Sequence, residues 1–251
     1  MINEQRKTVR SVLAPLCAEP RISSAMTSQL LIGDVVAVVD GRGDWLEVRC
    51  ADGYTGWVHV GYLTASTGTE DKWRVSLGCR VRDLVGTTRE LPLGARLAPD
   101  TEVLSGVAVD ADARVLQFPP TPAAVAASAE RLFVGASYLW GGVTPWGCDC
   151  SGFVQRVLWL HGVQLPRDAW QQALVGTRVA TYASDTHAPG DLLFFSDRDD
   201  RKITHVGLAL DAQRMVHCSL TRGGIAVEQL DSSDPYVVRL RAQCIEVRRV
   251  L

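Results

Sequence analysis

The sequence predicts an α+β domain that follows one or two small β-barrels. Short apolar runs, separated by turn-forming residues and without a helical period, fill residues 8–64. From about residue 120 the pattern changes to helices, and from Asp191 onward it changes again to strands. Because helices and strands do not alternate, an α+β arrangement fits better than a parallel α/β sheet. The expected domains are residues 1–66 and 67–119 for the barrels and 120–251 for the α+β domain.

Composition and charge exclude several classes of protein. The chain of 251 residues is 47% hydrophobic and 22% charged, which is typical of a soluble globular protein. Its formal net charge of −2 offers no basic surface, so a nucleic-acid partner is not expected. No stretch approaches the roughly 18 to 20 consecutive apolar residues of a membrane span, so a membrane partner is not expected either.

The N-terminus and the cysteines indicate a reducing compartment. The first ten residues lack the apolar core of about 7 to 15 residues that a secretory signal needs. The seven cysteines are an odd number and follow no disulfide spacing. We therefore expect a cytoplasmic protein.

The first barrel is predicted from apolar runs that lie between turn signals. The runs at 35–39 and 45–48 are bounded by Asp-Gly and Arg-Gly pairs. A strand with Trp45 and Val48 is followed at 52–58 by Asp-Gly-Tyr-Thr-Gly-Trp-Val. This arrangement resembles the bacterial SH3 domain, which implies a small SH3-like barrel here.

A weaker copy of the same pattern follows at about 72–118. Residues 91–95 (Leu-Pro-Leu-Gly-Ala) echo residues 30–34 (Leu-Leu-Ile-Gly-Asp), and short Val/Leu strands come after them. The copy has no tryptophans at the matching positions. We interpret it as a second SH3-like barrel, with a degenerate structural spacer as the alternative.

A proline-rich linker at 118–122 leads into the α+β domain. Thr121 is suited to cap, and Pro122 to open, an alanine-rich helix over 122–134. Apolar runs after Asp191 predict the strands of the domain. They are 192–195, 206–210, 215–218, 225–229 and a broken strand over 236–250.

A cysteine at the start of a predicted helix is the first candidate catalytic residue. After Cys150 the apolar residues keep a helical period as far as Leu160, and Gly162 supplies a stop. Cys150 therefore lies on the first turn, where unpaired N–H groups and the helix dipole favour a thiolate. A lowered pKa would make this thiol a nucleophile at neutral pH.

Two histidines on neighbouring strands are candidates for the base and its partner. His205 opens one predicted strand and His217 lies in the middle of the next. A tight turn centred near residue 211 would make the two directly opposite, with Cβ atoms about 4.5–5.5 Å apart. His217 would then hold His205 in the tautomer that accepts the thiol proton.

These motifs together resemble the NlpC/p60 family of cell-wall cysteine peptidases over about 120–225. The matching segments are 138–142 (Tyr-Leu-Trp-Gly-Gly), 149–154 (Asp-Cys-Ser-Gly-Phe-Val), 166–167 (Pro-Arg), 189–195 (Pro-Gly-Asp-Leu-Leu-Phe-Phe) and 205–207 (His-Val-Gly). The resemblance implies a papain-like fold, a triad of Cys150, His205 and His217, and Tyr138 as a hydroxyl on the oxyanion side. The backbone N–H of Cys150 would add a second donor to the oxyanion.

The SH3-plus-peptidase order, with no visible signal, resembles enzymes that trim free cell-wall peptides. The resemblance implies cleavage between D-glutamate, through its γ-carboxyl, and a diamino acid, without a cofactor. The substrate would be a murein tripeptide or related muropeptide with a free L-alanine amine. Asp149 and an acid of the first barrel, Glu19, would hold that amine near Tyr54. Ser151 and Trp140 are further expected substrate contacts. A buried ammonium must be paired with a carboxylate, which would exclude longer chains.

Other interpretations of the same residues and of the whole chain remain open. Asp149 could act only as the helix cap, and Tyr54 could be barrel core. Cys148 is expected to be a loop thiol without a role. A zinc site is a poor match, because structural sites favour paired C-x2–4-C spacing. The remaining histidines, for which we expect surface or turn positions, are His59, His161 and His187.

Two other functions compete with the trimming of free peptides. A secreted peptidoglycan endopeptidase would use the barrels to bind the wall. A wall-binding module without catalysis would not need a complete Cys-His-His set.

Overall fold

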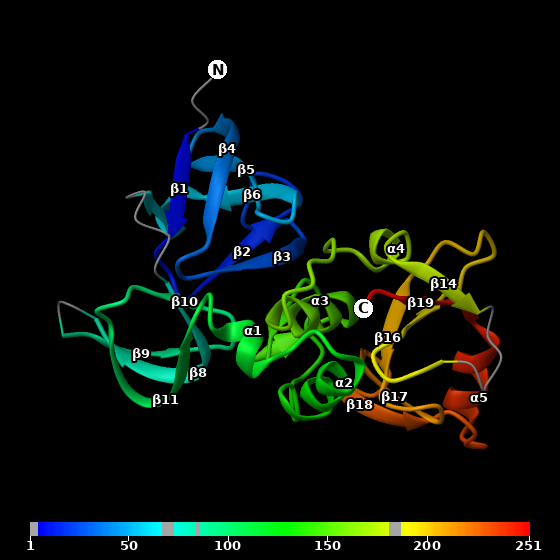
Figure 1. Ribbon diagram of the computed structural model, residues 1–251. Coiled ribbons are helices and arrows are strands. Elements are labelled where there is room, and N and C mark those ends of the chain that lie inside the picture. The colour runs from blue at the N-terminus through cyan, green and yellow to red at the C-terminus, as the bar shows by residue number, and fades with distance from the viewer. Residues whose placement is uncertain (1–4, 67–72, 84–85, 181–186) are drawn as a thin grey trace. The chain divides into compact units, whose positions relative to one another are not determined.

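The computed structural model describes residues 5–66, 73–83, 86–180 and 187–251. The chain forms two compact units that divide after Arg114 (Figure 1). The first unit contains two β-sheets, and the second combines helices with a six-stranded sheet and a short two-stranded hairpin. The expected boundary between residues 66 and 67 lies at the edge of the described residues.

The first sheet of unit 1 has seven antiparallel strands in the order β3-β2-β6-β5-β4-β1-β7. Its strands are β1 (Arg6–Val9), β2 (Leu13–Cys17), β3 (Met26–Leu31), β4 (Val35–Arg42), β5 (Trp45–Arg49), β6 (Thr55–His59) and β7 (Leu63–Ala65), with the short helix η1 (Val60–Tyr62) before β7. Alternate residues point inward and form a core that includes Leu16, Val48 and Val58. Tyr54 packs against this core, partly buried.

The second sheet of unit 1 is built around the long strand β8 (Arg74–Arg82). One edge of β8 pairs with β11 (Glu102–Asp110). On the other edge, β10 (Arg96–Leu97) pairs with the beginning of β8 and β9 (Thr88–Leu91) with its end. This smaller sheet lies in the region where the sequence pattern was weaker.

The second unit has the helix-then-sheet order that the sequence predicted, which confirms the α+β class. The helices are α1 (Arg114–Gln117), α2 (Pro122–Arg131), α3 (Cys150–Leu160), α4 (Ala169–Gln172) and α5 (Pro235–Ala242). The sheet strands are β14 (Thr177–Ala180), β15 (Leu192–Phe195), β16 (His205–Ala209), β17 (Arg214–Ser219), β18 (Gly224–Gln229) and β19 (Cys244–Arg249). A short hairpin of β12 (Val143–Thr144) and β13 (Gly147–Cys148) precedes α3.

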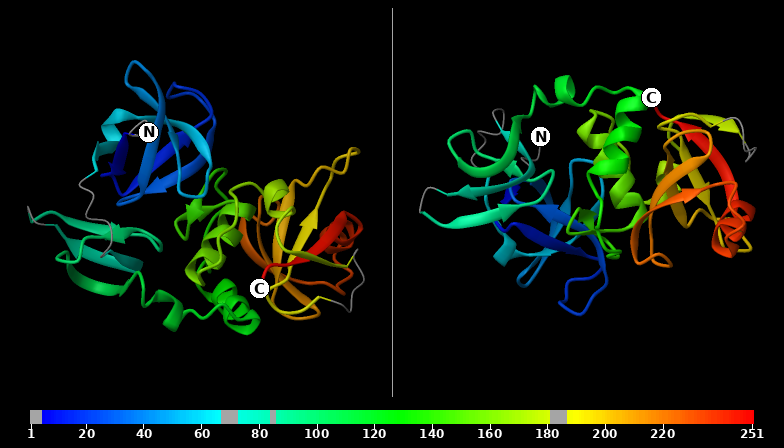
Figure 2. Two further views of the ribbon diagram at one scale, coloured as in Figure 1. Left: turned by 45° about the horizontal axis from the view of Figure 1, so that its top comes forward. Right: turned by 90° about the horizontal axis from the view of Figure 1, so that it is seen from below.

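The sheet of unit 2 runs β14-β19-β15-β16-β17-β18, with all pairs antiparallel. Helices α2 and α3 lie on one side of it and α5 on the other (Figures 1 and 2). The face toward α5 holds a core that includes Leu193, Phe195 and Met215. The strands are thereby fixed on both faces, which gives the residues at the beginning of β16 a rigid support.

Helices α2 and α3 begin where the sequence predicted. The hydroxyl of Thr121 accepts the N–H of Ala124 and Pro122 occupies the first turn of α2, which ends at Arg131. Helix α3 begins at Cys150 and buries the expected apolar face. Gly162 follows its end with φ of 81°, the left-handed conformation that terminates helices.

The prediction of a broken strand over 236–250 is wrong. Residues Pro235–Ala242 form α5, and only Cys244–Arg249 form a strand. Asp234 caps this helix by accepting the N–H of Tyr236, and Pro235 occupies its first turn. These are ordinary helix-start signals. The apolar residues of the helix mimicked a strand because they are interrupted by arginines.

Two of the histidines expected at surface or turn positions are buried. His161 is fully buried, with Nδ1 2.7 Å from the carbonyl oxygen of Pro119 and Nε2 2.9 Å from the hydroxyl of Ser128. It therefore attaches the proline-rich linker and α2 to the end of α3. His187 is also buried. His59 is partly exposed and accepts the N–H of Gly61 at the start of η1.

Candidate active site

The loop before α3 places Cys150 by close backbone packing. A Cβ atom added at Gly152 would collide with the carbonyl oxygen of Gly142, and one at Gly142 would collide with that of Gly147. The Leu139 N–H also donates to the carbonyl of Cys148 at 2.9 Å. The two glycine-containing motifs of the sequence thus hold the helix start against the preceding loop.

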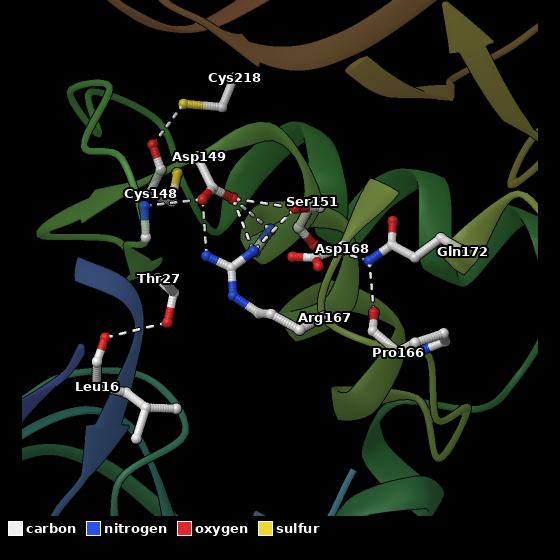
Figure 3. Close-up of polar contacts among 12 residues, drawn as sticks. Leu16, Thr27, Cys148, Asp149, Ser151, Pro166, Arg167, Asp168, Gln172 and Cys218 are labelled. Atoms are coloured by element: carbon white, nitrogen blue, oxygen red, sulfur yellow. Dashed lines mark hydrogen bonds and ion pairs between the residues drawn. The ribbon is translucent and has the colours of Figure 1, made fainter. Parts of the chain in front are cut away.

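A buried ion pair supports the same helix start (Figure 3). Arg167 donates to both oxygens of Asp149, with Nη1–Oδ1 at 3.0 Å and Nη2–Oδ2 at 2.7 Å. The Asp149 carboxylate also accepts the N–H groups of Gly141 and Gly152 and the hydroxyl of Ser151. Both ionic side chains are nearly inaccessible, at 2% and 9% exposure. Asp149 is therefore the cap of α3 and the partner of Arg167.

The electrostatics of Cys150 differ from the prediction. Burial, followed by the nearby Asp149 carboxylate, raises the pKa of the Cys150 thiol to about 12. Hydrogen bonds from the N–H groups of Val206 and Ser151 and the charge of Arg167 lower this pKa, but less strongly. The expectation that the helix start alone would lower it is therefore wrong. The resting residue is a thiol whose proton must leave as the sulfur attacks.

The base and its partner are in direct contact. His205 Nε2 lies 2.8 Å from His217 Nδ1. Burial, followed by the electrostatic interaction with His217, lowers the pKa of His205 to about 3, so its imidazole is neutral at physiological pH. Because Val206 donates its N–H to the Cys150 sulfur, the thiol lies beside the residue that follows His205. A neutral imidazole on the residue that precedes this contact can act as a general base for the thiol.

The two histidines meet by a different register from the one predicted. Strands β16 and β17 pair Leu208 with Val216 and Ala209 with Met215, so the turn is centred on residue 212. The side chain of Asp211 accepts the N–H groups of Gln213 and Arg214 in that turn. With this register His205 and His217 are diagonal neighbours. The sequence had suggested that they are directly opposite. Their long side chains close the remaining gap.

Sequence reasoning missed two charged residues behind His217, a glutamate and an arginine. His217 Nε2 lies 3.3 Å from the carboxylate Oε1 of Glu228, on β18. Arg222 donates to both oxygens of that carboxylate, at 2.7 and 2.9 Å, and to Asp234 at 3.1 Å. The alternation of β18 could have revealed Glu228, because a residue that follows the partner of His217 by two faces the same side.

The other predicted residues of unit 2 lie around the nucleophile. Tyr138 is partly buried and pairs with Cys148 in a parallel bridge. Burial, followed by the charge of Cys150, raises the pKa of the Tyr138 phenol, which therefore stays a proton donor. Ser151 is buried and accepts Arg167 Nη1 at 2.8 Å. The Trp140 ring is 65% exposed and available for contact.

The two predicted residues of the first barrel belong to unit 1. The carboxylate of Glu19 is exposed and lies 2.9 Å from Arg21. The backbone N–H of Tyr54 donates to Asp52, and its side chain packs on the barrel core. Their part in holding a substrate amine stays a prediction.

Cys148, expected to be a loop thiol, is buried and lies in strand β13. Cys218 donates its S–H to the carbonyl oxygen of Cys148 at 3.0 Å (Figure 3). The hydrogen bond with Cys218 and burial raise the pKa of Cys148, so this thiol stays protonated. In the described parts of the chain, no group of three or more His, Cys, Asp and Glu side chains is arranged to hold a metal ion. Within the same residues, no helix has the length and apolarity to cross a membrane.

Comparison with family models matches both units. The model described as the NlpC/P60 family matches residues 135–241, a range that contains Cys150, His205 and His217. The model described as the bacterial dipeptidyl-peptidase Sh3 domain matches residues 16–63. The second match includes Glu19 and Tyr54.

Two curated relatives, both named gamma-D-glutamyl-L-lysine dipeptidyl-peptidase, are similar over most of the chain. The Bacillus cereus protein is 26% identical, and the match covers 84% of this chain and 72% of the relative. The Bacillus subtilis protein is 28% identical, with 81% and 76% covered.

A crystal structure of an NlpC/P60 family protein from Bacillus cereus ATCC 10987 has the same fold. Its TM-score is 0.81, at 20% identity, and the match covers 98% of this chain and 99% of that one. The chain therefore carries an NlpC/P60 cysteine peptidase domain behind a bacterial dipeptidyl-peptidase SH3 domain.

Proposed function

We propose that this enzyme hydrolyses the γ-D-glutamyl–diamino acid bond of short cell-wall peptides with a free N-terminal L-alanine. Support comes from relatives named for γ-D-glutamyl-L-lysine that match most of the chain, barrel included. The observations that carry the chemistry are the 2.8 Å contact between His205 and His217 and the hydrogen bond from the N–H of Val206, the next residue after His205, to the thiol at the start of α3.

In the proposed first step, Cys150 attacks the γ-carbonyl carbon of D-glutamate. His205 takes the thiol proton as the S–C bond forms, which suits a neutral imidazole and a protonated thiol. The carbonyl oxygen becomes an oxyanion, for which the Cys150 N–H and the Tyr138 hydroxyl are the proposed donors. The imidazolium then gives its proton to the amine of the diamino acid as the C–N bond breaks.

In the proposed second step, water hydrolyses the thioester. His205 accepts a proton from the water, whose oxygen bonds to the γ-carbonyl carbon. The same donors stabilise the second oxyanion, and as the S–C bond breaks His205 returns its proton to the sulfur and regenerates the thiol. The products are L-Ala-γ-D-Glu and the free diamino acid or peptide.

The proposed basis of selectivity is a carboxylate pair that holds the free amine of L-alanine. Asp149 is one member by family resemblance, and Glu19 is the candidate from the barrel. Arg167 already neutralises Asp149, and the Asp149 oxygens accept five hydrogen bonds, whereas a carboxylate has about four acceptor sites. Asp149 alone therefore offers an ammonium little unpaired charge.

We expect acetylation of the L-alanine amine to lower kcat/KM by at least about a hundredfold. Acetylation removes the ammonium charge, whose hydrogen bonds to carboxylates are worth about 1.5–3 kcal/mol, and adds an acetyl group at the same point. Each 1.4 kcal/mol corresponds to about tenfold in rate. The measurement is hydrolysis of L-Ala-γ-D-Glu-L-Lys and of its N-acetyl form, with products identified by mass.

Two barrel variants test where the selectivity arises. Glu19→Gln should reduce the difference in kcat/KM between free and acetylated substrates, because it lowers kcat/KM for the free peptide. Asp40→Asn is the matched control, because Asp40 is another exposed barrel acid beside an arginine, Arg42. Equal kcat/KM for free and acetylated peptides in the wild type would contradict the trimming function and leave a wall endopeptidase.

We also propose that the enzyme acts on released peptides in the cytoplasm, as part of murein peptide recycling. The competing function is a secreted endopeptidase that uses the barrels to bind the wall. The two differ in substrate, because only the secreted enzyme must cut sugar-linked peptides. Release of peptides from intact peptidoglycan at a rate similar to that for free tripeptide would favour the competing function, as would recovery of the protein outside the cells that make it.

A further inference from the structure

Behind the two histidines lies a carboxylate to which the family resemblance assigned no role. We propose that Glu228 is a positioning residue that fixes the tautomer of His217 and thereby keeps His205 able to accept the proton of Cys150. This inference rests on the proposed catalytic roles of Cys150 and His205, and it adds a residue that acts on them from a third strand.

The tautomers of His217 and His205 follow from the chain of contacts that begins at Glu228. An ionised carboxylate only accepts hydrogen bonds, so the proton shared between His217 Nε2 and Glu228 Oε1 belongs to Nε2. In neutral His217, Nδ1 then carries the lone pair and accepts the N–H of His205 Nε2. His205 therefore has its proton on Nε2, and its Nδ1 is the nitrogen left to accept the thiol proton.

The surroundings keep Glu228 ionised. Burial raises the pKa of Glu228, but the hydrogen bonds from His217 and Arg222 outweigh it and lower the pKa to about 2. Arg222 is held in turn by Asp234 and lies over the Tyr236 ring, whose centroid is 4.6 Å from the guanidinium carbon. Tyr236 comes from α5 on the far side and also lies beside His217.

Loss of the acceptor and loss of the charge have different consequences. Glu228→Met removes both, so neither nitrogen of His217 is favoured for the proton. Glu228→Gln removes the charge but keeps one oxygen that can accept the Nε2–H. In a serine-protease triad, the wrong histidine tautomer lowers kcat by about 10⁴. We therefore expect Glu228→Met to lower kcat at least about a hundredfold with KM changed less than about threefold, and Glu228→Gln to stay within about tenfold of wild type.

A third variant separates positioning from a simple ion pair. Arg222→Lys breaks the two-point contact with Glu228 but leaves the carboxylate charged and facing His217. It should keep kcat within about threefold. If the Arg222–Glu228 pair only stabilises the β17–β18 hairpin, all three variants should lower the melting temperature. In that case none of them should lower kcat more than KM changes.

The tautomer itself can be measured without substrate. In ¹⁵N-histidine NMR spectra of the wild type and of Glu228→Gln, His217 should be protonated on Nε2 and bare on Nδ1. In Glu228→Met the two forms should be mixed. The wild-type spectrum decides the matter even if the methionine variant does not fold.

Two results would overturn the proposal: equal kcat for Glu228→Met and Glu228→Gln, or a wild-type His217 protonated on Nδ1. Either can be told apart from failure of the proposed function. That failure would appear as no cleavage of the γ-D-glutamyl substrate by the wild type, while the histidine spectrum would still report the tautomer.

Discussion

Replacing Cys150 by alanine is expected to lower kcat/KM by about four orders of magnitude or more, with little change in stability. The nucleophile and its base act as one unit, so loss of either removes nearly all of their joint effect. The substitution deletes one sulfur atom, which accepts backbone N–H groups, and keeps the Cβ atom at the helix start. Steady-state hydrolysis of the free tripeptide, with thermal unfolding measured on the same samples, checks both parts.

Cys148→Ala is the matched control for this variant. Cys148 is buried at the end of β13, two residues before Cys150, and it also carries a thiol. The control should retain activity within about tenfold of wild type. If Cys150→Ala kept more than about a tenth of the wild-type rate, Cys150 could not be the nucleophile.

The second large effect concerns stability: Asp149→Asn is expected to lower the free energy of unfolding by about 3–5 kcal/mol. The substitution leaves the guanidinium of Arg167, which is 2% exposed, without its charged partner. The amide can also accept fewer of the N–H groups that start α3. Urea denaturation of the variant and the wild type gives the difference directly.

A double-mutant cycle with Arg167→Met tests the cause of this loss. If the unpaired charge dominates, the double variant should be less destabilised than the sum of the single variants, by 1 kcal/mol or more. Strictly additive losses would mean that the cap, and not the ion pair, accounts for the effect. A loss below about 1 kcal/mol for Asp149→Asn would contradict both explanations.

Local signals in the sequence were sufficient for the fold and for the central pair of the site. Thr121 and Pro122 predicted the start of α2. The apolar period after Cys150 predicted α3 to within two residues of its end. The hairpin with His205 and His217 was predicted as well, although its register was not. The register depends on how the Asp211 side chain closes the turn, which the alternation of apolar residues does not encode.

The parts that sequence reasoning missed depend on contacts between distant residues. The Cys150 pKa is set by burial and by a carboxylate, whereas the helix start, which is visible in the sequence, has the smaller effect. The salt bridge of Asp149 joins two motifs that the sequence showed separately, 18 residues apart. Glu228 was overlooked because an acid in a half-exposed strand is usually a solvated residue. The helix signals at Asp234 and Pro235 were present but were outweighed by the apolar pattern.

The packing of Gly142 and Gly152 has a consequence for how this enzyme could diverge or be re-engineered. Neither position can hold a side chain, because carbonyl oxygens occupy the space that a Cβ atom would need. The glycines in the motifs by which the domain is recognised are therefore required by steric exclusion and not by the catalytic chemistry. A mutational library would be expected to retain glycine at these positions under selection for folding alone, with no substrate present. New specificities would have to arise from exposed neighbours such as Trp140, where the backbone leaves room for variation.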